Sequence, residues 1–529
     1  MDQLLRDLWL ILPELLVAAT ILFVLLSELL VGGDDEYEEV RASDTPALAG
    51  VGVALAVALL TFRASLGASQ VEREVFFRTL SVDPFSQFMK VLLLLAGLFA
   101  VLFSYQTPDV AVRKRCEYVS YLLGLLLGGM LLVSANDILM LYLALETVGI
   151  CSYVLAGSMK GSVRSTEAGF KYVLYGAASS GVLLYGLTFF YGMSGTTAIP
   201  EMFAKVAATI NHMAYPGGVP GTGGTLAVTM KLLPLPLFLV LAGLFYKVAV
   251  FPFHFWCPDV YEGSPLPVTA VFSVLVKTAG FAALVRFLYG FVLALDAEFG
   301  QQVFLNWELL TAILGTLSAL TMTLGNLAAL NQTNIKRLLA YSGIANAGYL
   351  MMGVAVLVFR RADQPVEVDG VVAVLFFLAV YLFANLGAFV VAIAIGDHLG
   401  KERIDDYAGL GRLEPLMGVS MAIFLFSLVG LPPLAGFIGK FYLFYAVIHH
   451  GLYWLAFIGI ANSVVSLFYY ARILRVMFLT EPPRGLELDL STHYKTLLWL
   501  LLVPVVVLGV YFGPLTEVAR QAARYFVNP

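Results

Sequence analysis

Long apolar stretches recur along almost the whole chain of 529 residues. Each stretch holds roughly 20 residues, the length that an α-helix needs to cross a bilayer. Because backbone polar groups in lipid must be satisfied within their own segment, such stretches fold as membrane-spanning helices. Hydrophobic residues make up 60% of the chain, charged residues make up 13%, and the mean hydropathy is +0.87. These values exclude a large water-soluble domain and predict an all-α polytopic membrane protein.

We expect about 14 transmembrane helices by this window count. The predicted helices cover 8–31, 47–64, 84–104, 117–135, 138–157, 168–193, 234–256, 265–293, 304–324, 335–359, 371–396, 415–446, 453–478 and 496–513. Short connections join them except at about 194–231, where an amphipathic segment, IPEMFAKVAATINHM, precedes a glycine-rich linker, GGVPGTGGT. We expect this long connection to form a surface element.

Lysine and arginine residues in the short loops predict the orientation of the chain. These residues fall in connections of one parity: Arg113, Lys114, Arg115, Lys160, Arg164, Lys336, Arg337, Arg472, Arg475 and Arg484. We expect these loops to face the cytoplasm. With an even number of spans, both termini are then predicted on the non-cytoplasmic side. The membrane that we expect is a bacterial inner membrane.

Prolines interrupt two of the predicted helices near their middles. Pro252 falls in the seventh span, and Pro432 and Pro433 fall in the twelfth. A proline removes a helical hydrogen bond and clashes with the carbonyl four residues earlier, so each break frees polar backbone groups inside the membrane. Interrupted helices in corresponding places of two halves indicate inverted repeats. The sequence therefore predicts two discontinuous helices within two inverted five-helix repeats.

This pattern divides the chain into four parts. Residues 1–116 hold the first three transmembrane helices, and residues 117–293 form the first repeat, with helices four to eight. Residues 304–478 form the second repeat, with helices nine to thirteen. Residues 479–529 hold the last transmembrane helix and a short tail.

Four ionisable residues lie deep inside the apolar stretches: Glu146, Lys247, Lys277 and Lys440. Groups of this kind are costly at bilayer depth and mark ion or proton pathways. Lys277 lies roughly 15 Å from either end of its predicted helix at about 1.5 Å per residue, too far for its ammonium to reach the membrane surface. We expect Glu146 to pair with Lys247. The four residues predict a proton path.

The chemistry that these groups allow is proton storage. A carboxylate that approaches or withdraws can switch a buried lysine between its ammonium and its amine near neutral pH. One pKa unit is about 1.4 kcal/mol, and one charge moved against 100 mV costs about 2.3 kcal/mol, so a swing of about two units matches that potential. The sequence has no nucleotide-binding loop, and we expect a partner or an ion gradient to supply the energy.

Three other polar residues are weaker candidates. Lys171 lies one turn after Glu167, and an ordinary ion pair explains it as well as a functional role does. His254 follows Lys247 by seven residues, and a structural histidine is as good an explanation as a proton relay. Lys90 is most simply read as marking the end of a helix.

Metal and iron–sulfur centres are not expected on this chain. The three cysteines, Cys116, Cys151 and Cys257, are scattered and form no C-x-x-C motif or Cys/His cluster.

Several stretches resemble the antiporter-like membrane subunits of complex I, the proton-translocating NADH-quinone oxidoreductase. They include LYLALETVGICSYVLAG, PFHFWCPDVYEGSP with the downstream VKTAGF, and GLPPLAGFIGKFYLF. The resemblance runs from about residue 80 to about residue 480. Lys440 and the segment DVYEGSPLPVTA match the type called subunit N in bacteria, which has counterparts in the mitochondrial and photosynthetic enzymes.

The resemblance implies roles for the buried charges. Glu146 matches the family's fifth-span glutamate, Lys247 its partner lysine in the seventh span, Lys277 the central eighth-span lysine, and Lys440 the lysine of the second half-channel. Lys171 matches a sixth-span lysine of subunit N. In this family the residues form a hydrated axis that couples quinone reduction to proton transfer.

The resemblance also implies partners and cofactors. The partners are other membrane-arm subunits, including further antiporter-like subunits, a peripheral redox arm and membrane lipids, with no nucleic acid. The flavin, the iron–sulfur clusters and the NADH and quinone sites are expected on those other subunits, so this chain is expected to bind no redox cofactor.

One position departs from the family pattern. Many antiporter-like subunits carry a histidine after Y-S-S-I-A in the tenth span, whereas this chain reads YSGIAN and has Asn346 there. Asparagine cannot take up a proton at accessible pH. Any relay between Lys277 and Lys440 then depends on water or on other polar groups.

The sequence therefore predicts a proton-translocating membrane subunit of an NAD(P)H or ferredoxin:quinone oxidoreductase, an enzyme subunit whose redox site lies on other chains. Two alternatives stay open. A subunit of a multi-subunit cation/proton antiporter would share the same lysines and broken helices, and only its partners would distinguish it. A structural subunit of the same complex that does not pump is the other alternative.

Overall fold

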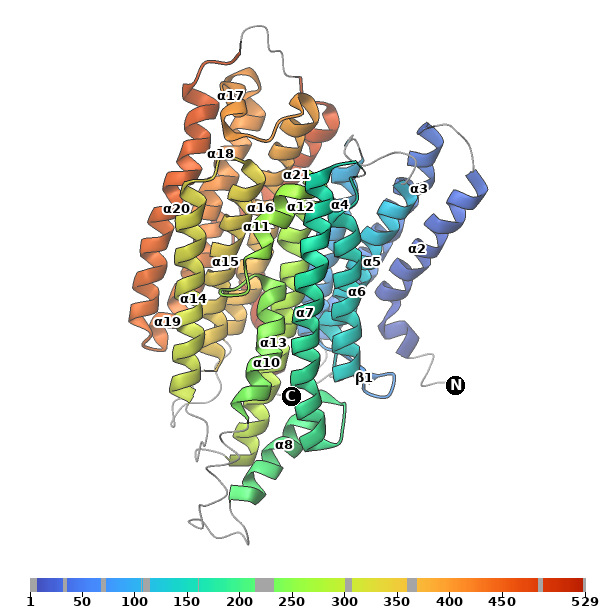
Figure 1. The fold of residues 1–529 in the computed structure, drawn as a ribbon, viewed down its shortest axis with the longest axis vertical. Helices are drawn as coiled ribbons and strands as arrows, with labels where there is room; N and C mark the ends of the chain where they lie inside the picture. The colour runs from blue at the N-terminus through green and yellow to red at the C-terminus, as the bar shows by residue number, and fades with distance from the viewer. Residues whose placement is uncertain are drawn as a thin grey trace.

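The computed structural model describes residues 7–31, 36–67, 73–105, 107, 115–159, 161–214, 233–299, 307–358, 369–483 and 489–526. Most of its helices run along the long axis of the molecule (Figure 1). The α-helices of the first half are α2 (Leu12–Val31), α3 (Glu36–Gly67), α4 (Pro84–Ser104), α5 (Arg115–Ser134), α6 (Ile138–Ala156), α7 (Val163–Ser194), α8 (Ile199–Ala214), α10 (Pro234–Val248), α11 (Trp256–Gly263), α12 (Leu266–Val271) and α13 (Lys277–Phe299).

The second half of the chain is also helical. Its α-helices are α14 (Trp307–Leu330), α15 (Ile335–Leu357), α16 (Asp369–Leu399), α17 (Leu410–Leu413), α18 (Pro415–Val429), α19 (Ala435–His449), α20 (Tyr453–Leu479), α21 (Thr492–Val510) and α22 (Gly513–Ala523). The chain also has two short 3₁₀ turns, η3 (Ile404–Tyr407) and η4 (Arg524–Phe526). The α2–α3 pair leans away from the remaining bundle (Figure 1).

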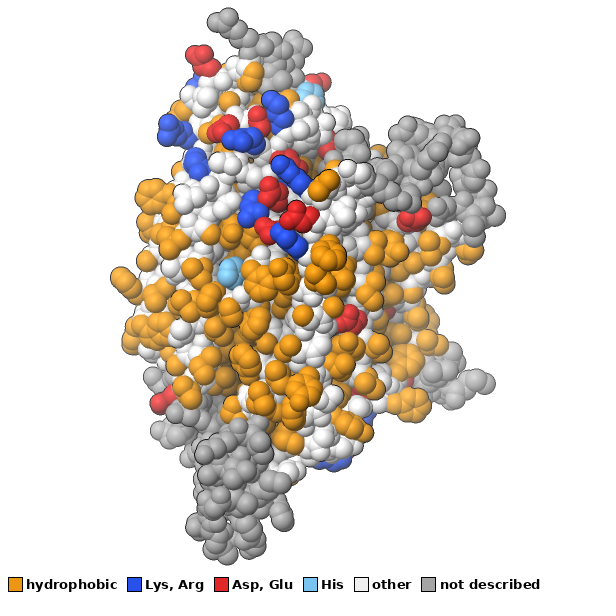
Figure 2. Space-filling model, viewed as in Figure 1, with side chains coloured by type: hydrophobic (Ala, Val, Ile, Leu, Met, Phe, Trp, Pro, Cys, Tyr) orange, Lys and Arg blue, Asp and Glu red, His pale blue; other side chains and the backbone are white. Residues whose placement is uncertain are grey.

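Eleven helices among the described residues are long and apolar enough to cross a membrane. Figure 2 shows a broad belt of hydrophobic side chains across the middle of the molecule, with a cluster of charged side chains above it. A belt of this kind is what a lipid-facing surface requires. The expectation of an all-helical, polytopic membrane protein is confirmed.

The remaining three predicted spans fall on helices outside these eleven. The first falls on α2, the seventh on α10 and the break that follows it, and the twelfth on α18 and α19. The total of 14 spans and the inverted symmetry of two repeats stay predictions.

Both predicted helix breaks are present. The first lies between Val248, where α10 ends, and Trp256, where α11 begins; Ala249 within it adopts a left-handed backbone conformation with φ of 59°. The second lies between Val429 and Ala435, where α18 ends and α19 begins. Non-helical backbone at membrane depth is tolerated only where protein or water covers it. The bundle must therefore supply polar contacts to the backbone groups that the two breaks expose.

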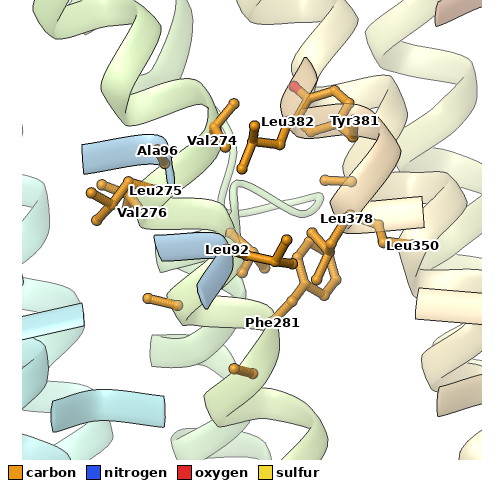
Figure 3. Close-up of a cluster of buried hydrophobic side chains, with 14 of the residues drawn as sticks. Leu92, Ala96, Val274, Leu275, Val276, Phe281, Leu350, Leu378, Tyr381 and Leu382 are labelled. Atoms are coloured by element: carbon orange, nitrogen blue, oxygen red, sulfur yellow. The ribbon is translucent and has the colours of Figure 1, made fainter. Parts of the chain in front are cut away.

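The helix that carries Lys277 forms the centre of the bundle. It comprises α12, a π-helical turn, η2 (Phe272–Val276), and α13, and it is buried along its whole apolar length. In Figure 3, Val274 and Leu275 of this helix lie in one buried cluster with Leu378 and Leu382 of α16 and with side chains of α4. Single-turn π segments inside α-helices are frequent at functional sites.

A small β-hairpin was not foreseen from the sequence. Strands β1 (Arg73–Val75) and β2 (Leu80–Val82) pair antiparallel, with Val75 opposite Leu80. The hairpin covers a buried apolar cluster near the start of α2, where Ile11 packs with Val82. Three-residue strands are too short to give a detectable period-two pattern in the sequence.

The long connection contains one described helix. The amphipathic segment forms α8, which buries Met202, Phe203 and Val206 and exposes Glu201 and Lys205 on its other face. The hydrogen bond from Lys205 lowers the pKa of Glu201 below its ordinary value. The predicted glycine-rich linker lies outside the described residues.

Candidate functional site

Lys247 lies one residue before the end of α10, with 2% of its surface exposed. Its ammonium lies 6.0 Å from the centre of the Tyr153 ring on α6. Glu146, also on α6, is half-buried and lies within electrostatic range of Lys247. No direct ion pair joins these two described residues at 4.0 Å or less, and the Glu146 Oε1 atom is buried without a hydrogen-bond partner. The predicted pairing is therefore an interaction across a gap rather than a salt bridge.

Lys277 is the first residue of α13, directly after the π-helical turn. Its Nζ atom is buried and makes no hydrogen bond within the described part of the chain. A Cβ atom placed on Gly343 of α15 would lie 2.5 Å from this Nζ, so the absence of a side chain at 343 leaves room for the ammonium. An unpaired cation at this depth is costly unless it is partly neutralised or solvated.

Lys440 lies in α19, five residues after the second break. Its Nζ donates to the Val429 carbonyl at 2.9 Å and to the Ser463 hydroxyl at 3.3 Å, and it lies 4.1 Å from the centre of the Tyr349 ring. Pro433 cannot donate the helical bond that Val429 would otherwise accept. The lysine therefore occupies the backbone site that the break opens.

The three lysines follow one another through the bundle. The stem of Lys247 packs against Gly280, which lies one turn after Lys277 on α13. The ammonium of Lys277 approaches α15 at Gly343, and Lys440 contacts Tyr349 two turns further along α15. We call the row of Glu146, Lys247, Lys277 and Lys440 the buried axis. Amine side chains in this setting can accept and release protons.

Two of the three weaker candidates, Lys171 and His254, lie in different parts of the bundle. Lys171 of α7 pairs with Glu167 at 2.8 Å, as its spacing predicts, and also with Asp259 of α11 at 2.8 Å. His254 lies in the first helix break, and its Nδ1 atom is buried without a hydrogen-bond partner among the described residues. Neither residue is in direct contact with an axis lysine through a hydrogen bond or ion pair that the described chain contains.

A polar cavity of about 190 Å³ opens beside Lys171 at one end of α7, α11 and α15. Three cations and three carboxylates line it: Arg164, Lys171, Arg337, Glu167, Asp259 and Glu262. Arg337 bonds both Asp259 and Glu262 at 2.7 Å.

The cavity also bears on the orientation of the chain. Arg164 and Arg337, which the loop charges predict on one side of the membrane, do meet at one end of the bundle. Arg472 binds the Leu330 carbonyl close by. Arg113, Lys114, Lys160 and Arg484 lie outside the described residues.

Three buried ion pairs were not foreseen from the sequence. In each pair a buried cation contacts a carboxylate directly: Lys90 contacts Glu14 at 2.6 Å, Arg115 contacts Asp44 at 2.7 Å, and Arg286 contacts Asp83 at 2.6 Å. The interpretation of Lys90 as a helix end is wrong, because it lies two turns inside α4 and is fully buried. Glu14 stands in the apolar stretch WLILPELLVA, and the same signal that singled out Glu146 would have found it.

Among the described residues, no three His, Cys, Asp or Glu side chains gather into a group that could hold a metal ion. The arrangement offers proton-transfer groups: one carboxylate and three amines in a row that crosses α6, α10, α13 and α19.

Known proteins share this fold and sequence. The family model described as NADH:quinone oxidoreductase/Mrp antiporter, TM matches residues 135–466. The chain is 39% identical over 486 residues to the NADH-quinone oxidoreductase subunit N of Anaeromyxobacter sp. (strain Fw109-5), with 89% of this chain and 90% of the relative covered. It is 43% identical over 458 residues to NADH-quinone oxidoreductase subunit N 2 of Chloroherpeton thalassium, with 85% and 84% covered.

Two solved structures extend the comparison. A chain of respiratory complex I from Thermus thermophilus, solved with bound aureothin, superposes with a TM-score of 0.72 at 29% identity, covering 96% of this chain and 98% of the other. A chain of the Mrp complex from Dietzia sp. DQ12-45-1b superposes with a TM-score of 0.78 at 22% identity, covering 98% of both chains, and shares the fold. By sequence along most of its length, and by an antiporter-like helical fold with two broken helices, the chain belongs to the family of NADH-quinone oxidoreductase subunit N.

Proposed function

We propose that this chain carries protons across the membrane as a subunit of a respiratory NAD(P)H or ferredoxin:quinone oxidoreductase, coupling quinone reduction to proton transfer along the buried axis. Glu146 modulates the charge of Lys247, and protons then pass through Lys277 to Lys440. The observation that supports this most is the row of three buried lysines, none of which forms an ion pair with a carboxylate in the described chain. An amine without a fixed counter-charge can change its protonation state at modest cost.

The proposal includes the surroundings of the axis. Lys171 stands at the polar cavity, where it is suited to pass protons inward from the cytoplasmic side, and His254 in the first break is a second candidate. The partners are other membrane-arm subunits, including antiporter-like ones, a peripheral redox arm and lipids. Those partners carry the flavin, the iron–sulfur clusters and the NADH and quinone sites, and this chain carries none. The expected location is a bacterial inner membrane with both termini on the non-cytoplasmic side.

A cation/proton antiporter subunit is the second candidate. The fold that this chain shares with a chain of an Mrp complex favours it, and the axis lysines would serve an ion gradient equally well. Purification in mild detergent followed by mass spectrometry separates the two. We expect quinone-site and iron–sulfur subunits to co-purify, with quinone-reductase activity. A set of small antiporter subunits in their place would move the driving force to an ion gradient.

A subunit that only supports the complex is the third possibility, and the Lys247→Ala variant tests it. We expect the assembled complex to form, because no described carboxylate contacts Lys247 directly, and Glu146, which interacts with it only at longer range, is half-buried. Proton transfer per electron should fall, since the axis loses its first amine. Normal proton transfer per electron in the assembled variant would remove Lys247 from the path.

A further inference from the structure

The connection between Lys277 and Lys440 passes α15, where Asn346 faces the interior. The amide Nδ2 of Asn346 donates to the Ser342 carbonyl at 2.9 Å, and its Oδ1 is buried without a hydrogen-bond partner in the described chain. A carboxamide holds no exchangeable charge near neutral pH. A proton that moves between the two lysines therefore needs other groups.

Hydroxyl groups lie at the Lys440 end of this connection. Ser463 of α20 accepts from the Lys440 ammonium at 3.3 Å, and its Oγ is 3.0 Å from the Tyr349 hydroxyl of α15. Tyr349 is buried, and its OH also bonds the Gly459 carbonyl at 3.1 Å. A hydroxyl both donates and accepts a hydrogen bond, so it can take one proton and release its own.

Hydroxyl groups also lie at the Lys277 end. The side chains of Ser342 on α15 and Tyr470 on α20 are hydrogen-bonded to each other. The next residue, Gly343, is the one whose Cβ position lies 2.5 Å from Lys277 Nζ and 3.3 Å from the Tyr381 hydroxyl of α16.

Tyr381 is placed to link Lys277 to the rest of the chain of hydroxyls. Its oxygen and the Lys277 ammonium are no more than about 6 Å apart, a gap that one water molecule can bridge. The Tyr381 hydroxyl is buried and has no hydrogen-bond partner among the described residues. It lies within electrostatic range of Tyr470. Figure 3 shows Tyr381 beside Leu382, across the buried cluster from the helix that carries Val274.

The hydroxyl groups at the Lys277 end and at the Lys440 end lie on one face of α15 and on one face of α20. Ser342, Asn346 and Tyr349 follow one another at intervals of four and three residues, so they share one face of α15. Ser463 and Tyr470 are seven residues apart on α20 and share a face in the same way. Seven residues rise about 10 Å along a helix, and hydroxyls occupy both ends of that distance. Asn346 lies between them.

We propose that this row, the hydroxyl ladder, carries protons between Lys277 and Lys440 past Asn346; it consists of Tyr381, Ser342, Tyr470, Tyr349 and Ser463. The inference rests on the proposed function of the axis. In one transfer the Lys277 ammonium gives up a proton and becomes an amine. Each hydroxyl accepts a proton on a lone pair and releases its own to the next group, directly or through water. The Lys440 amine takes up the last proton and becomes an ammonium.

Tyr289 of α13 provides a control for a purely mechanical role of the ladder. Its side chain is comparably buried, and its hydroxyl donates a hydrogen bond to the Phe526 carbonyl. Removing the Tyr289 hydroxyl therefore deletes a buried hydrogen bond between α13 and η4 that involves no member of the ladder.

The test uses the assembled complex in liposomes, driven by NADH and a soluble quinone, with protons transferred per electron as the readout. We expect Tyr349→Phe and Tyr470→Phe each to remove from this quantity the protons that this chain contributes, because the further antiporter-like subunits keep their own proton paths. Tyr289→Phe should stay close to the unaltered protein. Ser463→Ala should also lower it, whereas Ser463→Thr, which keeps a hydroxyl, should restore it.

The Lys277→Met variant is measured in parallel. It distinguishes the hydroxyl ladder from the proposed function of the buried axis. Normal pumping in Lys277→Met contradicts the proposed function itself. Loss of pumping in Lys277→Met together with unaltered pumping in Tyr349→Phe and Tyr470→Phe overturns the ladder alone. An equal loss in Tyr289→Phe also overturns it, since packing would then explain every effect. If a tyrosine variant does not assemble, the Ser463→Ala and Ser463→Thr pair decides.

Discussion

Buried charges in the N-terminal helices and in the buried axis have different kinds of partner. Near α2 to α5, Lys90 and Arg115 each contact a carboxylate at 2.6 or 2.7 Å. Along the axis, Lys277 has no hydrogen-bond partner among described groups, and Lys440 contacts only a carbonyl and a hydroxyl at hydrogen-bond distance. A fixed counter-ion holds a charge in place, while neutral partners allow it to be lost and regained. The difference separates charges that hold helices together from charges suited to transfer.

The largest effect is expected on the paired side. Lys90→Met leaves Glu14 buried and unpaired, and breaking a buried pair in this way costs about 3–5 kcal/mol. We expect little assembled complex, measured by native electrophoresis of membrane extracts. The matched control is Glu14→Met combined with Lys90→Met, because replacing both charges by apolar groups is often neutral. Normal assembly of the single variant would show that the complex does not need the Lys90–Glu14 pair. It would contradict the distinction between charges that hold helices together and charges suited to transfer.

The next effect is expected on the axis side. Lys440→Met removes a cation without stranding a carboxylate, so the complex should assemble near normal levels. Proton transfer per electron should fall by the contribution of this chain, because the second half-channel loses its amine. Lys440→Arg is the informative control, since a guanidinium keeps the charge but does not release its proton. Pumping by the arginine variant would show that only the charge matters.

A smaller effect is expected at Gly343. Gly343→Ala places a Cβ 2.5 Å from Lys277 Nζ, and the flexible end of the lysine must move away. Because only a side-chain tip is displaced, we expect normal assembly and a smaller fall in proton transfer per electron than in Lys440→Met, since the ammonium is misplaced but present. Gly290→Ala, whose new Cβ would meet Phe203 at an ordinary 3.5 Å, controls for a methyl group added to a bundle helix. Equal pumping in both variants would argue against close approach of Lys277 to α15.

The smallest effect is expected at Lys171. Its side chain is 31% exposed and its ammonium is shared between Glu167 and Asp259, so its loss should cost no more than about 1 kcal/mol of stability. Thermal melting of the purified complex of Lys171→Ala should therefore shift little. A strong loss of proton transfer at unchanged stability would support the proposed role of Lys171 in passing protons inward, and unchanged proton transfer would contradict it.

Hydropathy and proline placement were sufficient to predict most of the fold. Apolar runs of bilayer length gave the helices, and Pro252 with Pro432 and Pro433 gave the positions of both breaks, because a proline acts locally on its own helix. The hairpin at 73–82 was missed because its strands are only three residues long.

The site was only partly predictable. The positions of Lys247, Lys277 and Lys440 follow from charge inside apolar sequence, and the structure buries all three. Their partners do not follow, since contacts such as Lys277 with Gly343 depend on how helices far apart in the sequence pack. The same reason explains the absence of a salt bridge between Glu146 and Lys247, for which the sequence suggested direct pairing.

The most direct test of the account is the number of protons transferred per electron by the assembled complex that carries Lys277→Met. Lys277 lies at the centre of the axis and has no hydrogen-bond partner among the described residues. Relative to the unaltered complex, we predict the loss of the protons that this chain contributes per electron, with assembly unchanged. An unchanged number of protons per electron in fully assembled complex would contradict the claim that the buried lysines carry protons.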